Sequence, residues 1–161
     1  MRTLLIFATG LLVGLAVHSV GAQDSRIAGM NLNHVMIRVE NVAEASRYYQ
    51  EKFGFKEAVA FKNPDGTPGL TFLQVGRDTF LELMPSSAQN PPGFDHIGLE
   101  VADAKEAVAQ FRQRGLQARD PNQTRLTGSV ISGVQGTNGI LFELIEFPQG
   151  SLLRKAIDAW K

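Results

Sequence analysis

Residues 33–39 read NHVMIRV, and residues 95–101, which lie 62 positions further along the chain, read DHIGLEV. The likeness returns near the end of each copy, where LELM at residues 81–84 matches FELI at residues 142–145. Self-similarity at a fixed period indicates that one supersecondary unit has been used more than once. The sequence therefore predicts two related halves, joined by a stretch rich in proline and small polar residues at 85–93.

Each half predicts the same order of elements, namely strand, helix, strand, strand, strand. Apolar and polar residues alternate over 32–39, as in a strand with one buried face. Asn41 is expected to cap a helix over 42–53, which Gly54 follows, and Asp103 caps the helix of the second half. The predicted strands and helices are 32–39, 42–53, 55–62, 70–75 and 79–84, then 94–101, 104–114, 116–119, 128–134 and 140–147. The fold class is thus α+β, with two βαβββ modules in tandem.

The N-terminal segment predicts a signal peptide. Arg2 precedes an uncharged run from Leu4 to Val17, and the small residues of Val20-Gly21-Ala22 suit a signal peptidase. The run is shorter than the roughly 20 apolar residues that a membrane span needs. We therefore expect an exported protein, periplasmic or secreted, with no membrane contact once its leader is removed. The expected organisation is a signal peptide 1–22, an N-terminal tail 23–30, a domain 31–148 made of module one 31–84, linker 85–93 and module two 94–148, and a C-terminal helix 149–161 capped by Ser151.

The charges of the chain balance, with 16 lysines and arginines against 16 aspartates and glutamates. Domains that bind nucleic acid carry a basic excess, so we expect no nucleic-acid partner. The sequence contains no cysteine, which excludes disulfides, thiolate metal sites and cysteine nucleophiles. Any chemistry must therefore come from histidines, carboxylates, hydroxyl groups or a bound cofactor.

Two histidines follow the leader, and each lies near the start of the first strand of a half. His34 and His96 occupy equivalent places in the repeat, and so do Glu82 and Glu143 in the last strand of each half. A carboxylate among apolar strand residues is costly to bury unless something pairs with it. Two imidazoles and two carboxylates suit one divalent cation, such as zinc, nickel, cobalt, manganese or ferrous iron. The alternative is that these four side chains form ordinary hydrogen bonds within the sheet.

Several motifs of the chain resemble the vicinal oxygen chelate superfamily, which includes glyoxalases, bleomycin-resistance proteins and extradiol dioxygenases. These motifs are HVMIRV at 34–39, YYQEKFGF at 48–55, LEL at 81–83, DHIGL at 95–99 and NGILFELIE at 138–146. The resemblance covers nearly all of 31–148 and implies that the sheet is cupped around a metal ion. Within the superfamily the chain is most similar to the glyoxalase I family, the lactoylglutathione lyases. The family's four metal ligands match His34, Glu82, His96 and Glu143.

The likeness to glyoxalase I implies a metal-dependent isomerase or lyase. Its metal, with nickel, zinc or cobalt favoured over iron or manganese, would chelate two adjacent oxygens of a small-molecule substrate such as a glutathione adduct. Glu143 would carry the proton between neighbouring carbons, and Arg38 matches an arginine that contacts glutathione in that family. We also expect an apolar part of the substrate to meet Met36, Phe80, Met84, Phe94 and Leu141.

Other functions within the superfamily stay open. In extradiol dioxygenases, His34, His96 and Glu143 would hold ferrous iron, and Glu82 would be surplus. A periplasmic binding or resistance protein would keep the pocket without turnover, and such relatives normally lack the ligands. Methylmalonyl-CoA epimerases share the frame but usually have glutamine at the place of Glu82. The glutamate therefore favours the isomerase or lyase.

The linker 85–93 contains three prolines, two of them consecutive, and predicts a stiff, extended spacer. Such a spacer would let the two modules of one chain sit apart and pair with those of a second chain. In the superfamily that the chain resembles, a site is built either from the two modules of one chain or from half of each of two chains, and glyoxalase I enzymes use the second arrangement. We therefore expect a C2 homodimer. Each of its sites would take His34 and Glu82 from one chain, and His96 and Glu143 from the other.

Overall fold

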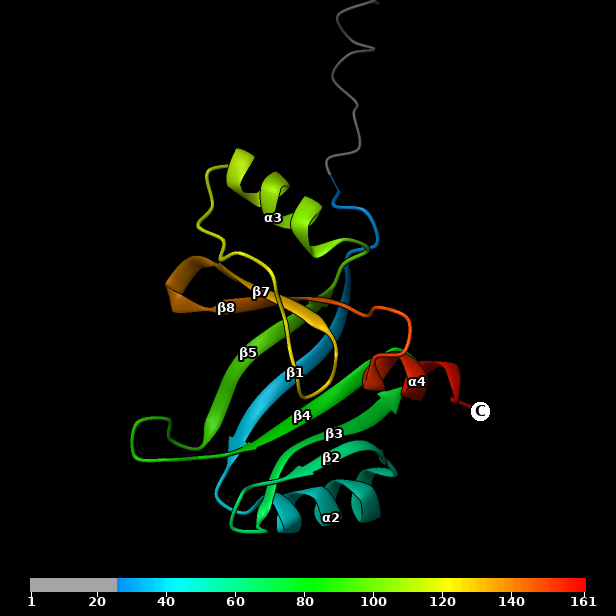
Figure 1. Cartoon of the computed structure of the whole chain (residues 1–161). Coiled ribbons are helices and arrows are strands. Elements are labelled where there is room, and N and C mark those ends of the chain that lie inside the picture. Colours follow the sequence, from blue (N-terminus) through cyan, green and yellow to red (C-terminus); the bar gives the residue numbers. More distant parts are fainter. Residues whose placement is uncertain (1–25) are drawn as a thin grey trace, which may run out of the picture.

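The computed structural model describes residues 26–161. Within these residues, eight strands form one mixed sheet in the order β2-β3-β4-β1-β5-β8-β7-β6, so the α+β fold class is confirmed (Figure 1). The strands are β1 (Asn31–Val39), β2 (Lys56–Lys62), β3 (Pro68–Gly76), β4 (Thr79–Pro85), β5 (Gly93–Glu100), β6 (Asn122–Gln123), β7 (Val130–Gln135) and β8 (Leu141–Glu146). The helices are α2 (Val42–Phe53), α3 (Ala104–Gln113) and α4 (Leu152–Asp158), with a 3₁₀ turn η1 (Thr137–Gly139).

The signal peptide predicted over residues 1–22, and the first residues of the predicted tail, lie outside the described part of the chain. Among the residues that the structure describes, no helix is both long enough and apolar enough to cross a membrane. The leader and the export that it implies therefore stay predictions.

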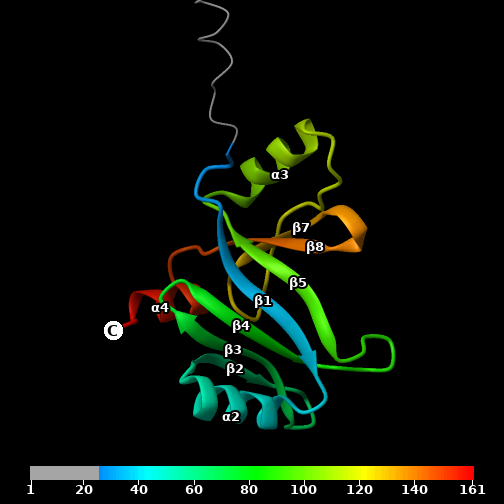
Figure 2. The ribbon, with the colours of Figure 1, turned by 180° about the vertical axis from the view of Figure 1, so that it is seen from behind.

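The two central strands, β1 and β5, join the two sides of the sheet. They pair antiparallel with each other, while β1 pairs parallel with β4 and β5 pairs parallel with β8. The order strand, helix, strand, strand, strand occurs on each side of this central pair. Helix α2 packs against β3 and α3 packs against β7, so each half of the sheet carries one of these helices (Figures 1 and 2).

The two outer helices begin at the capping residues that the sequence indicates. The Asn41 side-chain oxygen accepts a hydrogen bond from the Glu44 backbone N–H at 3.1 Å. Asp103 accepts the equivalent bond from Glu106 at 2.8 Å. Both predicted helix starts are confirmed, because these caps satisfy N–H groups that the first helical turn leaves free. Gly54 follows α2 with φ 74°, a left-handed conformation that favours glycine.

Two predicted elements differ from the structure. The strand expected over 116–119 is reduced to a single bridge between Ala118 and Val134, and the short strand β6 follows instead. Pro121 lies directly before β6 and has no N–H to donate to a ladder. The last helix, α4, is shorter than the predicted 149–161, and Ser151 at its N-cap position makes no side-chain capping bond.

Helix α4 packs on the face of the sheet that also carries the charged inner residues. Leu153 and Ile157 are fully buried and form one apolar cluster with residues of β3, β4 and β8. The other buried members of this cluster are Phe72, Phe80, Ile145 and Phe147. Side chains alternate along a strand, so Phe80 shares its face with Glu82 two residues later. Helix α4 therefore closes one end of the face on which the candidate metal ligands lie.

Candidate metal centre

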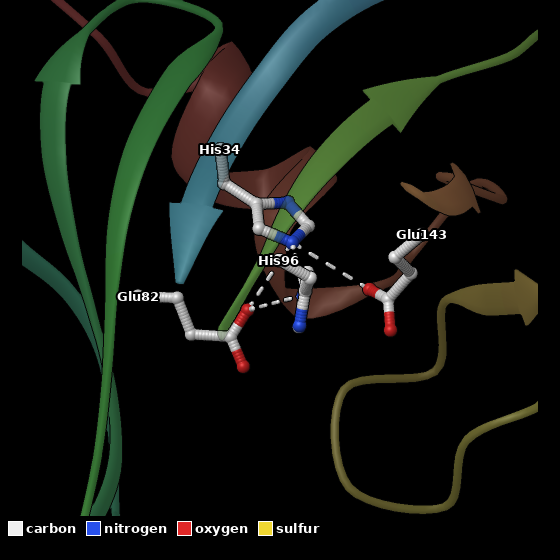
Figure 3. A group of neighbouring side chains, drawn as sticks. All are labelled: His34, Glu82, His96 and Glu143. Carbon is white, nitrogen blue, oxygen red and sulfur yellow. Dashed lines mark hydrogen bonds and ion pairs between the residues drawn. The ribbon is translucent and has the colours of Figure 1, made fainter. Parts of the chain in front are cut away.

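The four predicted metal ligands converge at the centre of the sheet (Figure 3). His34 comes from β1, Glu82 from β4, His96 from β5 and Glu143 from β8. These are the two central strands and the parallel partner of each. One nitrogen or oxygen of every side chain lies within 4.8 Å of the others. The repeat in the sequence thus becomes a pseudo-symmetric cluster on one face of one sheet.

The distances within the cluster suit ligands that share one ion. The Nε2 atom of His34 lies 3.1 Å from His96 Nε2, 3.3 Å from Glu82 Oε2 and 3.6 Å from Glu143 Oε1. His96 Nε2 lies 4.0 Å from Glu82 Oε2. Ligand atoms at about 2.1 Å from a metal ion are separated from each other by about 3 to 4 Å. The observed spacing is of that size.

Gly98 makes room for the first histidine. It lies opposite His34 in the β1–β5 ladder. A Cβ atom at position 98 would lie only 2.0 Å from His34 Cε1, which no real contact allows. The ring therefore occupies the space that any side chain at 98 would need.

Both histidines have a hydrogen-bond acceptor behind the ring. His34 Nδ1 lies 3.0 Å from Asn33 Oδ1, and the Asn33 amide nitrogen donates to the Asp78 carbonyl at 2.9 Å, which orients the amide oxygen toward the ring. His96 Nδ1 lies 2.8 Å from Asp95 Oδ1. With Nδ1 as the donor in each ring, both Nε2 atoms present lone pairs to each other. Two lone pairs and two carboxylates facing one point fit a bound cation.

The pKa values of the cluster show that burial disfavours the charged forms of these side chains when no cation is bound. Burial, with the charges of Glu143 and Asp95, raises the pKa of Glu82 from 4.5 to about 8. Burial raises the pKa of Glu143 to about 7, against an opposing effect of Arg119. Burial and the neighbouring His96 ring lower the pKa of His34 to about 3. A divalent cation would favour both ionised carboxylates and the neutral imidazole, and so reverse these tendencies.

Arg119 lies beside Glu143, and the sequence reasoning missed it. Gly133 pairs with Glu143 across β7 and β8, so the two residues share a face of the sheet. A Cβ atom on Gly133 would lie 2.4 Å from Arg119 Nη2, and the guanidinium therefore rests on the glycine. Among the described residues, the Arg119 side chain has no hydrogen-bond or ion-pair partner. It lines a cleft of about 370 Å³ together with Leu141.

The predicted substrate-contacting residues are distributed over different environments. Met36 and Phe80 are buried, and Phe80 belongs to the apolar cluster beneath α4. Met84 and Leu141 are half-buried and Phe94 is exposed. The Nε atom of Arg38 donates to Asp95 Oδ2 at 2.6 Å, so part of its guanidinium already has a partner within the chain. Contact of any of these residues with substrate stays a prediction.

The expected sharing of sites between two chains is wrong for this structure, because one chain supplies all four ligands. The linker 85–93 is not an extended spacer. Ser87 and Asn90 exchange backbone hydrogen bonds of 2.8 and 3.1 Å and form a turn. The chain thereby passes from the end of β4 to the start of β5, which pairs antiparallel with β1 of the same chain. This pairing brings the two histidines together without a partner.

The sequence signal for the residues around the ligands was weak. Asn33 and Asp95 precede the two histidines at equivalent places in the repeat, and this equivalence was the one available hint. Gly98, Arg119 and Gly133 acquire their roles only through pairing between strands that lie far apart in the sequence.

Comparison with known proteins identifies the family. Residues 31–144 match the model of the glyoxalase/bleomycin resistance protein/dioxygenase superfamily. The chain belongs to this superfamily. The family resemblance seen in the sequence is therefore confirmed.

Curated relatives include lactoylglutathione lyases. That of Neisseria meningitidis serogroup A is 31% identical over 129 residues, covering 75% of this chain and 94% of the relative. That of Salmonella typhimurium is 29% identical over 125 residues, covering 73% and 93%. That of Arabidopsis thaliana is 31% identical over 121 residues, but the match spans only 43% of the length of the plant protein.

Solved structures with the same fold include methylmalonyl-CoA epimerases. One selenomethionine epimerase structure has a TM-score of 0.61 and 25% identity, with coverage of 73% of this chain and 95% of the epimerase. The epimerase of Mycobacterium tuberculosis has a TM-score of 0.65 and 21% identity, with coverage of 77% and 93%. These similarities show that the chain shares its fold with these structures.

Proposed function

We propose that the chain is a metal-dependent isomerase or lyase of the glyoxalase I type, which takes a proton from the carbon next to a carbonyl group and returns it to the neighbouring carbon that carried the carbonyl oxygen. The observation that carries the proposal is the cluster of His34, Glu82, His96 and Glu143, whose ligand atoms lie within 4.8 Å of one another. The lactoylglutathione lyases among the relatives support the same chemistry.

The donor set fits one divalent cation, with nickel, zinc or cobalt favoured and iron or manganese as alternatives. When bound, such an ion supplies Lewis-acid stabilisation of negative charge on substrate oxygens. His34, Glu82, His96 and Glu143 would hold it. Burial of His34 and Glu82 keeps water away from their side of the centre, so substrate has to approach from the side of Glu143.

Glu143 is the residue that would move the proton. Its side chain is 16% exposed, against 9% for Glu82 and 0% for His34, so it is the ligand most open to a substrate. In the metal-free protein burial raises its pKa to about 7, whereas a bound cation would favour the ionised carboxylate, which is the form that accepts a proton from substrate. Proton transfer by a positioned side chain contributes typically 10²- to 10⁴-fold in rate.

The substrate would carry an anionic group. Arg119 presents a guanidinium that makes no hydrogen bond or close ion pair with the described residues, on the same face as Glu143 and in the cleft that Leu141 also lines. A guanidinium binds carboxylates in a two-bond fork. The glutathione adduct that gives the lactoylglutathione lyases their name has such carboxylates. We therefore propose a small anionic α-oxoaldehyde adduct, with glutathione as the first thiol to test.

Two other activities belong in the same test. Methylmalonyl-CoA epimerases share the fold, so methylmalonyl-CoA is the second substrate to test. For an extradiol dioxygenase, Glu82 would be surplus, yet its Oε2 atom lies 3.3 Å from His34 Nε2, within the ligand cluster. Glu82 therefore favours four-ligand chemistry over the three-ligand iron site and over a binding protein without metal.

The test uses purified protein with its bound metals measured by mass spectrometry. We expect one nickel, zinc or cobalt ion per chain and isomerisation of the methylglyoxal–glutathione hemithioacetal. Glu143→Gln should lower kcat by at least 100-fold, while Glu57→Gln on the exposed edge of β2 should match the wild type. Turnover of methylmalonyl-CoA or of a catechol, with none of the hemithioacetal, would contradict the proposal.

Export and dimerisation are further proposals. The leader pattern over 1–22 implies a mature chain that begins at Gln23, and N-terminal sequencing of the native protein would detect an intact Met1 if this is wrong.

Exposed apolar side chains, including Leu32 and Phe53, support a C2 homodimer. Sedimentation of the purified protein tests that state directly.

A further inference from the structure

Two bulges in the central ladder lie directly before the two histidines. Leu32 pairs with Leu99 and His34 pairs with Gly98, so Asn33 is an extra residue on β1. Met36 pairs with His96 and Ile37 pairs with Phe94, so Asp95 is an extra residue on β5. A bulge residue leaves the regular alternation of the strand, and its side chain is aimed differently from that of an ordinary strand residue.

Each bulge places an acceptor behind the ring of the next residue. Asn33 Oδ1 lies 3.0 Å from His34 Nδ1, and Asp95 Oδ1 lies 2.8 Å from His96 Nδ1. In a regular strand these neighbours would point to opposite faces of the sheet. The bulges are thus the reason why both rings have a partner on the side away from the ligand cluster.

The two acceptors differ in charge and in support. The Asn33 amide is neutral and is held by the Asp78 carbonyl at 2.9 Å. Asp95 is a carboxylate, and the Arg38 guanidinium binds its second oxygen at 2.6 Å. Only His96 therefore has a charged acceptor, and that acceptor is itself fixed by an ion pair that is about four-fifths buried.

We propose that Asp95, held by Arg38, is a positioning residue that keeps a proton on His96 Nδ1 and directs Nε2 toward the metal. A carboxylate behind a ligating imidazole fixes its tautomer and orientation and raises its basicity. His96 would then bind the metal more strongly than His34 does. This inference rests on the proposed metal site and not on the reaction that the site performs.

Metal affinity gives the first test. Zn²⁺ is titrated against a chromophoric chelator into the wild type, Asp95→Ala, Asp95→Asn and the control Asp120→Asn, which removes an exposed carboxylate bound to Arg112. Loss of such a supporting partner typically costs 10- to 100-fold in affinity. We expect that loss for Asp95→Ala and a smaller one for Asp95→Asn, whose amide oxygen still accepts from Nδ1. Equal affinity of Asp95→Ala and the control would overturn the proposal.

The protonation of the ring gives the second test, which needs neither metal nor substrate. Nitrogen NMR of the metal-free protein reads which nitrogens of His96 carry protons. We expect a protonated Nδ1 in the wild type and in Asp95→Asn, and a shift toward the Nε2–H tautomer in Asp95→Ala. An unprotonated Nδ1 in the wild type, or an unchanged ring in Asp95→Ala, would refute the positioning role. Failure of the proposed reaction would leave this result untouched.

Discussion

Gly98 and the ring of His34 compete for the same volume on the inner face of the sheet. In Gly98→Ala the new methyl group would force the ring away from His96, and we expect the protein to lose most of its bound metal. Zinc content per chain after dialysis measures the effect. Gly76→Ala is the control, because its methyl group would meet only Thr79 Oγ1 at 3.1 Å. Full metal content in Gly98→Ala would contradict the geometry of the site.

The raised carboxylate pKa values predict how the metal-free protein responds to pH. Stability that comes from protonated Glu82 and Glu143 is complete below their unfolded value of 4.5, and is lost as pH rises through about 7 and 8. His34 acts in the opposite sense, because its pKa is lowered to about 3, but its contribution is already complete above 6.5. Between pH 6.5 and 8.5 these two carboxyl groups lose their protons in the folded protein, so their contribution to stability should fall.

The midpoint of urea unfolding measures this fall. We expect a lower midpoint at pH 8.5 than at pH 6.5 for the metal-free protein. Saturating Zn²⁺ should remove the difference, because the ion stabilises the ionised carboxylates. Glu82→Gln should also reduce the difference between the two midpoints, because one of the two titrating carboxyl groups is removed. A midpoint that stays constant in the metal-free wild type would show that the two glutamates are not held as the structure indicates.

At the scale of elements, α4 holds one end of the site together. Leu153 is completely buried in the cluster with Phe72 and Phe80. Leu153→Ala should destabilise the protein by about 2 to 5 kcal/mol, the usual cost of a leucine-sized cavity. Urea unfolding measures the change, and Leu126→Ala at a half-exposed position should stay within about 0.5 kcal/mol of the wild type. A small effect at Leu153 would mean that α4 is only loosely attached.

How well an element was predicted depended on whether its signal is local. The starts of α2 and α3 follow from Asn41 and Asp103, whose caps act within three residues. The convergence of the two histidines and two glutamates was also predictable, because the repeat places them in pairs at equivalent strand positions. That they bind a metal stays a prediction. The strand expected over 116–119 was wrong, since its pairing depends on β7 across a loop. The bulges at Asn33 and Asp95 could not be predicted from the sequence, because register is a property of two paired strands together.

At the scale of the whole molecule, a site that lies within one chain can be distinguished from the shared site that the linker 85–93 predicted. Two inactive variants, Glu82→Ala and Glu143→Gln, are mixed under conditions that exchange subunits. Because each chain carries its complete ligand set, every site in a mixed dimer keeps one defect, and no activity should return. Recovery of about half the activity per mixed dimer would show that sites are shared between chains, as simple counting for a C2 dimer requires.

The β1–β5 ladder also has a consequence for how long the folded state lasts. This ladder joins the two sides of the sheet, and a cation at its centre would take His34 and Glu82 from one side and His96 and Glu143 from the other. The ion would act as a cross-link between segments that are far apart in sequence and therefore meet late in folding. Interactions formed after the transition state slow unfolding and leave the folding rate nearly unchanged. Metal removal should accordingly shorten the lifetime of the native chain far more than it delays refolding.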